Sequence, residues 1–206
     1  MSPAPARTSN AEIVAAGRAL LESGGLDAVT MQAVAAQVGV RAPSLYKRFP
    51  SRGALIAAIA TATLEELGEH IAPLSHEPDA AAGLRQLALA YRAFAWANPR
   101  AFELLSMNLP LDWRPSVKDT ARATAPVLTL AERLVGPEQA LEAARLITAF
   151  ANGFIAMELA GAFRLGGDLD SSFRYGVDAI IGALARDAAP SVAGDAPRST
   201  SGPPSP

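Results

Sequence analysis

The sequence predicts an all-α protein of about nine helices, with an N-terminal domain of three helices containing a helix-turn-helix and a C-terminal helical bundle. Three observations support this fold class. Alanine, the best helix former, is the commonest apolar residue in a chain that is 50% hydrophobic but only 6% aromatic. Apolar residues recur at helical spacing between capping residues, glycines and prolines. The apolar–polar alternation typical of a half-buried strand persists nowhere in the 206 residues.

Four helices are predicted in the first third of the chain, each bounded by a recognisable start and stop signal. Small polar residues cap helix starts, proline is tolerated in the first turn, and glycine readily ends a helix. The first helix starts at caps within 8–10 and ends at Gly24-Gly25, and the second starts at Thr30 and ends at Gly39. The third starts at Pro43 and ends at Pro50, and the fourth starts at Ser51 and ends at about Ala72.

The rest of the chain predicts five more helices and a polar tail. Residues 108–115 hold two prolines and form an irregular connection. Residues 188–206 are rich in Ser, Pro, Gly and Ala, which bury too little surface to offset the entropy of ordering, so we expect disorder there. The predicted helices span 79–97, 99–107, 116–135, about 138–165 and about 170–187. The predicted units are a flexible start at 1–8, a helix-turn-helix domain at 9–55, a second helical domain at 56–187 and the tail.

Residues 30–49 fit a helix-turn-helix, in which a second short helix can enter the DNA major groove. Ala35 is small enough to let the two helices touch, and Gly39 supplies the positive φ of the turn. The alternative is an ordinary helical hairpin inside a bundle. Charge favours DNA binding: residues 1–55 carry six basic and three acidic side chains, a net +3, whereas the remainder carries twelve and seventeen, a net −5.

The stretch from Thr30 to Leu55 resembles the DNA-binding signature of the tetracycline-repressor (TetR) family, above all in its Pro-Ser-Leu-Tyr-Lys-Arg-Phe core. The resemblance covers about residues 9–56 and implies an operator-binding protein. It implies phosphate contacts from Tyr46, Arg48 and Arg52, and a backbone contact from Thr30, which also caps its helix. Candidates for contacts to base edges or methyl groups are Gln32, Arg41, Ala42, Pro43, Ser44 and Lys47.

Segments 91–105 and 150–161 resemble one C-terminal subtype of this family, which carries a Trp-x-x-x-His-Gly-like pattern. Asn152 stands where that pattern has histidine, so its role toward a ligand stays open, and Glu158 could either orient a ligand or bond within the bundle. Aromatic and methionine side chains gather in this half, which predicts a cavity for a lipophilic or aromatic effector, with ordinary core packing as the alternative. The candidate ligand residues are Phe94, Phe102, Met107, Trp113, Phe150, Asn152, Phe154 and Met157.

The predicted helix at 138–165 is apolar on two nearly opposite faces, so it must be buried on both. One face consists of small residues, and the last helix has an apolar stripe of its own. We interpret the two helices as half of an intermolecular four-helix bundle, matching the family's usual homodimer; the alternative is burial within one protomer. The predicted interface residues are Ala149, Gly153, Ala156, Ala160, Phe173, Val177, Ile180 and Leu184.

Composition narrows the remaining function classes. With no cysteine, disulfides and thiolate metal sites are excluded, and His70 and His76 offer little for a histidine site, so we expect no metal and no cofactor. No nucleophile–base pair or carboxylate pair has a suggestive spacing, so we expect no enzyme. The first residues lack a signal-peptide pattern and no run approaches ~20 apolar residues, which predicts a cytoplasmic protein without a membrane partner. The alternative function is a helical adaptor or small-molecule-binding protein that does not bind DNA.

Overall fold

A computed structural model describes residues 8–188 of the chain. This part holds nine α-helices and no strand, as the sequence predicted. The helices are α1 Asn10–Gly24, α2 Met31–Gln37, α3 Ala42–Tyr46, α4 Arg52–Ile71, α5 Ala80–Ala97, α6 Pro99–Ser106, α7 Val117–Val135, α8 Ala140–Leu159 and α9 Leu169–Ala188. Three short 3-10 helices join them, η1 Leu26–Ala28, η2 Ala72–His76 and η3 Leu111–Trp113.

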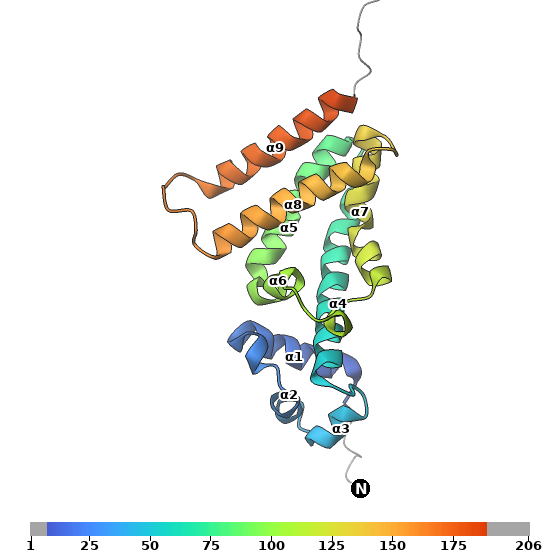
Figure 1. Ribbon diagram of the computed structural model, residues 1–206, viewed down its shortest axis with the longest axis vertical. Helices are drawn as coiled ribbons and strands as arrows, with labels where there is room; N and C mark the ends of the chain where they lie inside the picture. The colour runs from blue at the N-terminus through green and yellow to red at the C-terminus, as the bar shows by residue number, and fades with distance from the viewer. Residues whose placement is uncertain (1–7, 189–206) are drawn as a thin grey trace, which may run out of the picture.

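Helices α1 to α3 form a small domain at one end of the molecule, and the long helix α4 runs from it into the larger C-terminal domain (Figure 1). α1 begins at an N-cap formed by Ser9, whose hydroxyl accepts from the Glu12 amide while the Glu12 carboxylate accepts from the Ser9 amide. α1 packs tightly on α4, because a Cβ added at Gly17 would lie only 2.6 Å from the Ile59 side chain. This packing fixes α4 to the small domain.

α4 belongs to two hydrophobic cores. Leu55 and Ile59 are buried with the residues of α1 to α3, whereas Leu67 and Ile71 are buried against α5 and α7. The domain boundary predicted at residues 55–56 therefore falls inside a continuous helix. The N-terminal core also takes in Ala101, Leu104 and Leu109, which follow α5 in the sequence.

In the C-terminal domain, α8 and α9 lie side by side across the end of α5 and α7 (Figure 1). The predicted helix at 138–165 ends early, at Leu159, because Gly161 takes a φ of 63° and the amide of Ala162 bonds back to the Met157 carbonyl. Residues 160–168 then form a loop. The Asp168 carboxylate ends it by accepting from the Asp170 and Ser171 amides at the start of α9.

α8 is long and apolar enough, by length and composition alone, to span a membrane. It carries Glu142, Arg145 and Glu158, however, and it packs against α5, α7 and α9. We therefore interpret it as a core helix of the C-terminal domain. Two predictions concern residues outside the described part of the chain: the flexible start at 1–8 and the disordered tail at 188–206. Only residues 8 and 188 of these segments are described.

Candidate nucleic-acid interface and ligand cavity

The helix-turn-helix is built by local hydrogen bonds that the sequence predicted. The Thr30 hydroxyl accepts from the Ala33 amide at 3.1 Å and so caps α2. Gly39 has a φ of 70°. Its amide donates to the Ala36 carbonyl, and the amide of Val40 donates to the Ala35 carbonyl. This pairing satisfies the last carbonyls of α2 and turns the chain sharply. Ala35 is buried in the N-terminal core.

α3 is anchored from within and exposes its other side. Leu45 and Phe49 are buried in the N-terminal core, while the Tyr46 side chain, 51% exposed, projects to the surface. Ala42 is partly buried against the core. The remaining predicted DNA-contacting side chains of α2, the turn and α3 all lie at the surface: Thr30, Gln32, Arg41, Pro43, Ser44, Tyr46, Lys47 and Arg48.

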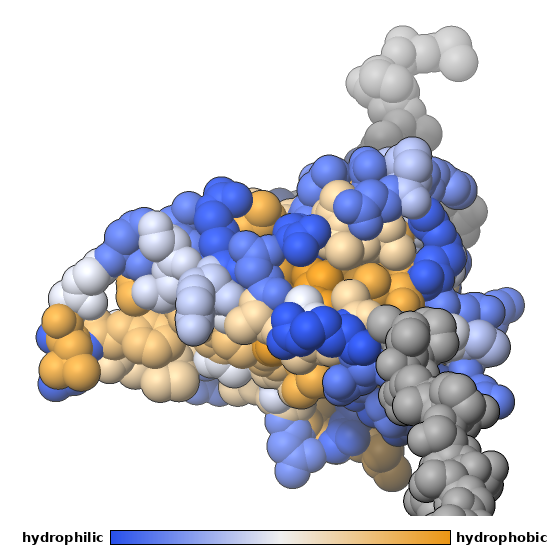
Figure 2. Space-filling model, turned by 90° about the horizontal axis from the view of Figure 1, so that it is seen from above, coloured by the Kyte–Doolittle hydropathy of each residue, from blue (hydrophilic) through white to orange (hydrophobic). Residues whose placement is uncertain are grey.

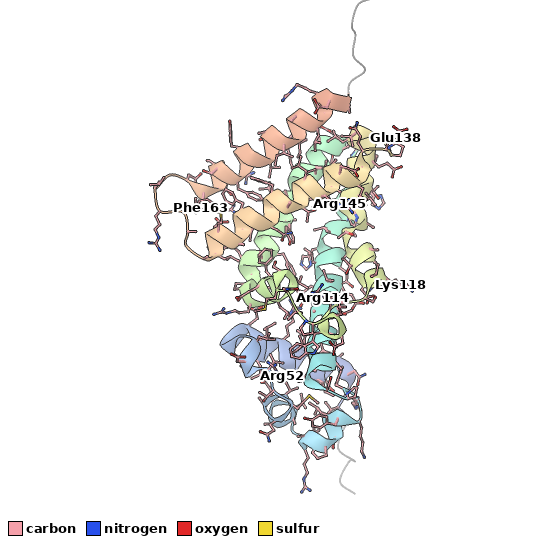
Figure 3. All side chains as sticks on the ribbon, in the orientation of Figure 1. Arg52, Arg114, Lys118, Glu138, Arg145 and Phe163 are labelled. Carbon is pink, nitrogen blue, oxygen red and sulfur yellow. The ribbon has the colours of Figure 1, made fainter. Side chains whose placement is uncertain are left out.

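Arg52 has partners within the small domain that the sequence did not predict. Its guanidinium donates to the Val29 carbonyl at 2.7 Å and to the Leu26 carbonyl at 2.6 Å, and it lies 5.5 Å from the centre of the Trp113 ring. Figure 3 shows it within the small domain. Arg52 therefore ties the start of α4 to η1, and the predicted phosphate contact stays a prediction for its remaining N–H groups. Arg48, in contrast, is exposed and donates to the Asn10 side chain at 2.9 Å.

Trp113 was predicted to line the ligand cavity, and that prediction is wrong. The indole of η3 covers Gly53 at the start of α4, where an added Cβ would lie 2.1 Å from the indole nitrogen. It packs on the N-terminal core with Val38 and Leu105 among the other partly buried side chains. Trp113 thus joins the segment after α6 to the DNA-binding domain.

A second contact between the two domains, besides that of Trp113, connects α1 with α6. The Glu22 carboxylate accepts from the Arg100 amide at 3.2 Å and from the Ala101 amide at 2.8 Å, so it caps the N-terminus of α6. A carboxylate is stabilised there by the unpaired amides and the helix dipole. Arg18 of α1 also donates to the Glu66 carboxylate of α4 and to the Asn98 side chain. Sequence reasoning missed this contact, because the partners lie about eighty residues apart.

The C-terminal domain contains a solvent-open cavity of about 390 Å³ between α4, α5, α7 and α8, with the end of α6 at its edge. Of the eight predicted ligand residues only Asn152 lines it. The lining residues are Leu64, Leu67, Ile71, Leu87, Ala88, Tyr91, Leu105, Ser106, Ala123, Thr124, Val127, Ile147, Thr148, Ala151 and Asn152.

The predicted aromatic and methionine set lies elsewhere. Phe150 of α8 stacks on Phe173 of α9 with ring centres 5.9 Å apart, and Phe154 meets Phe173 edge-on at 5.2 Å and also contacts Phe163. Phe94 and Phe102 are buried in the core, whereas Met107 and Met157 are exposed. The prediction failed because residue type does not distinguish a side chain that lines a cavity from one that fills a helix–helix contact.

Tyr91 is the cavity residue that the sequence analysis missed. Its hydroxyl donates to the Asn152 side-chain oxygen at 2.6 Å. Burial raises the pKa of Tyr91 to about 12, and the hydrogen bond to Asn152 opposes part of that rise. The spacing of Leu84, Leu87 and Tyr91 on one face of α5 could have indicated that the tyrosine points inward.

An ion-pair cluster joins α5, α8 and α9 beside this cavity. Arg92 makes two hydrogen bonds to the Glu158 carboxylate, at 2.8 and 2.5 Å, and one to Asp170 at 2.8 Å. The Glu158 side chain is only 2% exposed. Hydrogen bonds from Arg92 hold the pKa of the Glu158 carboxyl below its usual value despite the opposing effect of burial. Of the two roles considered for Glu158, the structure supports bonding within the bundle.

The predicted dimer residues divide into two groups. Ala149, Gly153, Ala156 and Ala160 form an exposed face of α8. Figure 2 shows a band of hydrophobic surface along one side of this domain. Phe173 and Val177, by contrast, are buried inside the protomer against α5 and α8, so their assignment to the interface is wrong; Ile180 and Leu184 are partly buried against the same core.

Comparisons with known proteins cover both domains. Residues 13–59 match the family described as bacterial regulatory proteins, tetR family, and residues 84–180 match the tetracyclin repressor-like C-terminal domain. The chain belongs to the TetR family. The C-terminal match includes both segments, 91–105 and 150–161, on which the sequence resemblance to a C-terminal subtype was based.

Relatives of this TetR-family chain include regulators and solved structures. The Mycobacterium tuberculosis HTH-type transcriptional regulator Rv0681 is 28% identical over 159 residues, which are 76% of this chain and 73% of that protein. The class A tetracycline repressor from transposon 1721 of Escherichia coli is 28% identical over 155 residues, 72% and 66% of the two chains. The structure of a TetR variant from Acinetobacter baumannii AYE in complex with minocycline has a TM-score of 0.67 at 22% identity, covering 87% of this chain and 98% of that one. The chain is therefore a DNA-binding regulator of TetR fold.

Proposed function

We propose that this chain is a homodimeric repressor that binds an inverted-repeat DNA operator and leaves it when a small molecule fills the C-terminal cavity. We further propose that it acts in the cytoplasm and catalyses no reaction. The observation that carries the proposal is the surface of α2 and α3. Its polar and basic side chains are exposed together on a domain of net charge +3, while Leu45 and Phe49 are buried and anchor α3 to the N-terminal core.

The contacts proposed to DNA follow from this geometry. Tyr46 and Arg48 lie at the surface, where a hydroxyl and a guanidinium can donate to phosphates. Lys47 follows directly after α3 and is proposed to reach a base edge. Arg52 donates to two carbonyls within the domain, and its remaining N–H groups are proposed to reach a phosphate at the start of α4.

The proposed dimer rests on α8. Its face of Ala149, Gly153 and Ala156 is apolar and exposed, and its small side chains would let a second helix approach closely. A twofold dimer presents two α3 helices in symmetric orientation, which selects an operator with the same symmetry. The minocycline complex of a structural neighbour supports a small-molecule effector as the release signal.

Lys47→Ala, with Lys118→Ala as its control, tests the proposal. These are the only two lysines, and Figure 3 shows Lys118 on the side of the C-terminal domain, away from α3. Operator fragments selected from random DNA by the wild-type protein serve as the probe, measured by fluorescence anisotropy. We expect Lys47→Ala to weaken binding about tenfold or more and to relax sequence preference, because a good base contact contributes about 1–3 kcal/mol.

Lys118→Ala removes the same charge and is expected to bind within about twofold of wild type. Tyr46→Phe should weaken binding to all sequences alike, since phosphate contacts carry no sequence information. Equal binding by Lys47→Ala and Lys118→Ala would place the interface elsewhere. Failure of the wild type to select any DNA would favour the alternative, a small-molecule-binding helical protein without an operator.

A further inference from the structure

The lining of the cavity carries no charged side chain. Its fifteen lining residues comprise ten aliphatic side chains together with Tyr91, Asn152, Ser106, Thr124 and Thr148. A carboxylate or ammonium group lying against these aliphatic side chains would lose part of its hydration without gaining an ion pair, which is unfavourable. The occupant of the cavity is therefore expected to be uncharged.

The surface beside the cavity also disfavours anions. A groove between α4 and α7 shares Leu64 and Ala123 with the cavity wall. Glu65, Glu69 and Asp119 line this groove, and they outnumber its one cation, Arg122. A negatively charged compound approaching along the groove would be repelled.

The cavity is aliphatic rather than aromatic. Tyr91 is its one aromatic side chain among the described residues, because the phenylalanines of α8 pack against α9. Stacking of a ligand between several aromatic rings is not available there, so of the predicted lipophilic or aromatic effectors the lining favours the lipophilic kind. Leucine, isoleucine, valine and alanine side chains instead match a saturated chain or ring.

The polar end of the cavity is oriented to donate. The Tyr91 hydroxyl donates to the Asn152 side-chain oxygen and so uses one of that oxygen's two acceptor positions. The Asn152 amide nitrogen donates to no acceptor within residues 8–188 and is not fully buried, so its N–H groups are available to a ligand in the cavity. A ligand that pairs with them needs an acceptor oxygen.

We propose that the effector is a neutral, mainly aliphatic molecule with one carbonyl or similar acceptor oxygen, which receives a hydrogen bond from the Asn152 amide. The proposal deepens the proposed function, since it assigns a ligand class to the cavity held to control DNA release. At about 390 Å³, the cavity is at the small end of the range for small-molecule sites.

The first test compares charge at constant chain length. The full-length protein without DNA is titrated by calorimetry with 2-decanone, decanoate and decylammonium. We expect 2-decanone to bind at least tenfold more tightly than either ion. Stronger binding of decanoate or decylammonium would overturn the assignment of a neutral ligand.

The second test isolates the hydrogen bond. 2-Methyl-1-decene has the shape of 2-decanone with a methylene in place of the carbonyl oxygen, and both are titrated into wild type, Asn152→Leu and the cavity control Thr148→Val. The ratio of ketone to alkene affinity should fall about five- to tenfold in Asn152→Leu, the value of one uncharged hydrogen bond, and less than twofold in Thr148→Val. An unchanged ratio in Asn152→Leu, or an equal fall in the control, would overturn the role of Asn152.

Tyr91→Phe provides an independent measurement if Asn152→Leu fails to fold. This variant keeps the Asn152 N–H donors and removes only the hydroxyl that donates to the Asn152 side-chain oxygen. Ketone affinity should therefore stay within about threefold of wild type. A loss of tenfold or more would overturn the role of Asn152 as the donor. Adding 2-decanone to the operator complex separates the two proposals. Binding without DNA release contradicts the release function and leaves the ligand class standing, whereas release by decanoate alone contradicts the ligand class.

Discussion

Arg92→Met should destabilise the C-terminal domain more than any exposed charge change. The Arg92 and Glu158 side chains are 14% and 2% exposed, and two hydrogen bonds join them. Removing the arginine leaves the glutamate carboxylate buried without its cation, which typically costs about 3–5 kcal/mol. The lost bond to Asp170 adds little, because Asp170 is 50% exposed. We therefore expect the free energy of unfolding at pH 7 to fall by about 3 kcal/mol.

The size of this loss should depend on pH in one direction. Hydrogen bonds from Arg92 lower the pKa of the Glu158 carboxyl in the folded protein below its ordinary value of 4.5. The stability from ionised Glu158 is then fully present above pH 4.5 and is lost as the pH falls through the folded pKa. In Arg92→Met, burial without the cation raises the pKa of Glu158 instead. The difference between wild type and variant should thus be largest near pH 7 and shrink below pH 4.5.

Urea denaturation followed by circular dichroism at pH 7 and pH 4 measures both effects. Arg174→Met is the matched control, since Arg174 pairs with Asp170 on the surface with both side chains about half exposed. It should cost less than about 0.5 kcal/mol at either pH. A loss in Arg92→Met as small as in the control, or one that grows toward pH 4, would refute the buried ion-pair reasoning.

Two further outcomes test the packing. Gly153→Leu should convert dimers into monomers, as measured by light scattering at about 10 µM. Protomer stability should change little, because an added Cβ meets nothing within 4 Å in the protomer. A monomer mass for the wild type would contradict the proposed interface. Gly53→Val should cost about 1–3 kcal/mol because its Cβ collides with the Trp113 indole, and Trp113→Ala should relieve that cost in the double variant. Additive losses in the double variant would exclude the collision.

The DNA-binding domain was predictable because its signals are local. Thr30, Gly39 and Ser51 each act within four residues, through a cap or a positive φ, so their spacing alone determines where α2 and α4 begin and where the turn lies. Pro43 lies in the first turn of α3, as its missing amide hydrogen allows. Helix positions beyond this domain were predicted equally well, except at the C-terminal end of α8.

The ligand cavity was not predictable, because its walls depend on which helices become neighbours. Periodicity showed that α8 is apolar on two faces, but it could not say that Phe154 meets α9 while Asn152 faces α5. Trp113 lies in an irregular segment with no periodicity at all, and its partner Gly53 is sixty residues earlier. Arg52 was assigned by its resemblance to a family position, and nothing in the sequence indicated that two of its N–H groups also donate to the carbonyls of Leu26 and Val29.

α6 links the cavity to the DNA-binding domain, and this link predicts how release can be uncoupled from ligand binding. Its N-terminus is held by the Glu22 carboxylate of α1, while Leu105 and Ser106 at its other end line the cavity. Eight helical residues span only about 12 Å, so a ligand that displaces the cavity end also strains the cap. A ligand releases DNA only by its differential affinity for the two states, and that coupling is reciprocal.

Glu22→Ala removes the cap without touching the cavity or the surface of α3. We expect 2-decanone to bind the DNA-free variant within about twofold of wild type while its effect on operator affinity falls severalfold, and operator DNA should weaken ketone binding by the same reduced factor. Anisotropy and calorimetry measure the two sides of this cycle. An undiminished ligand effect on DNA affinity in Glu22→Ala would mean that the coupling passes through α4 instead, whose Leu64 lines the cavity and whose first residue is fixed to η1.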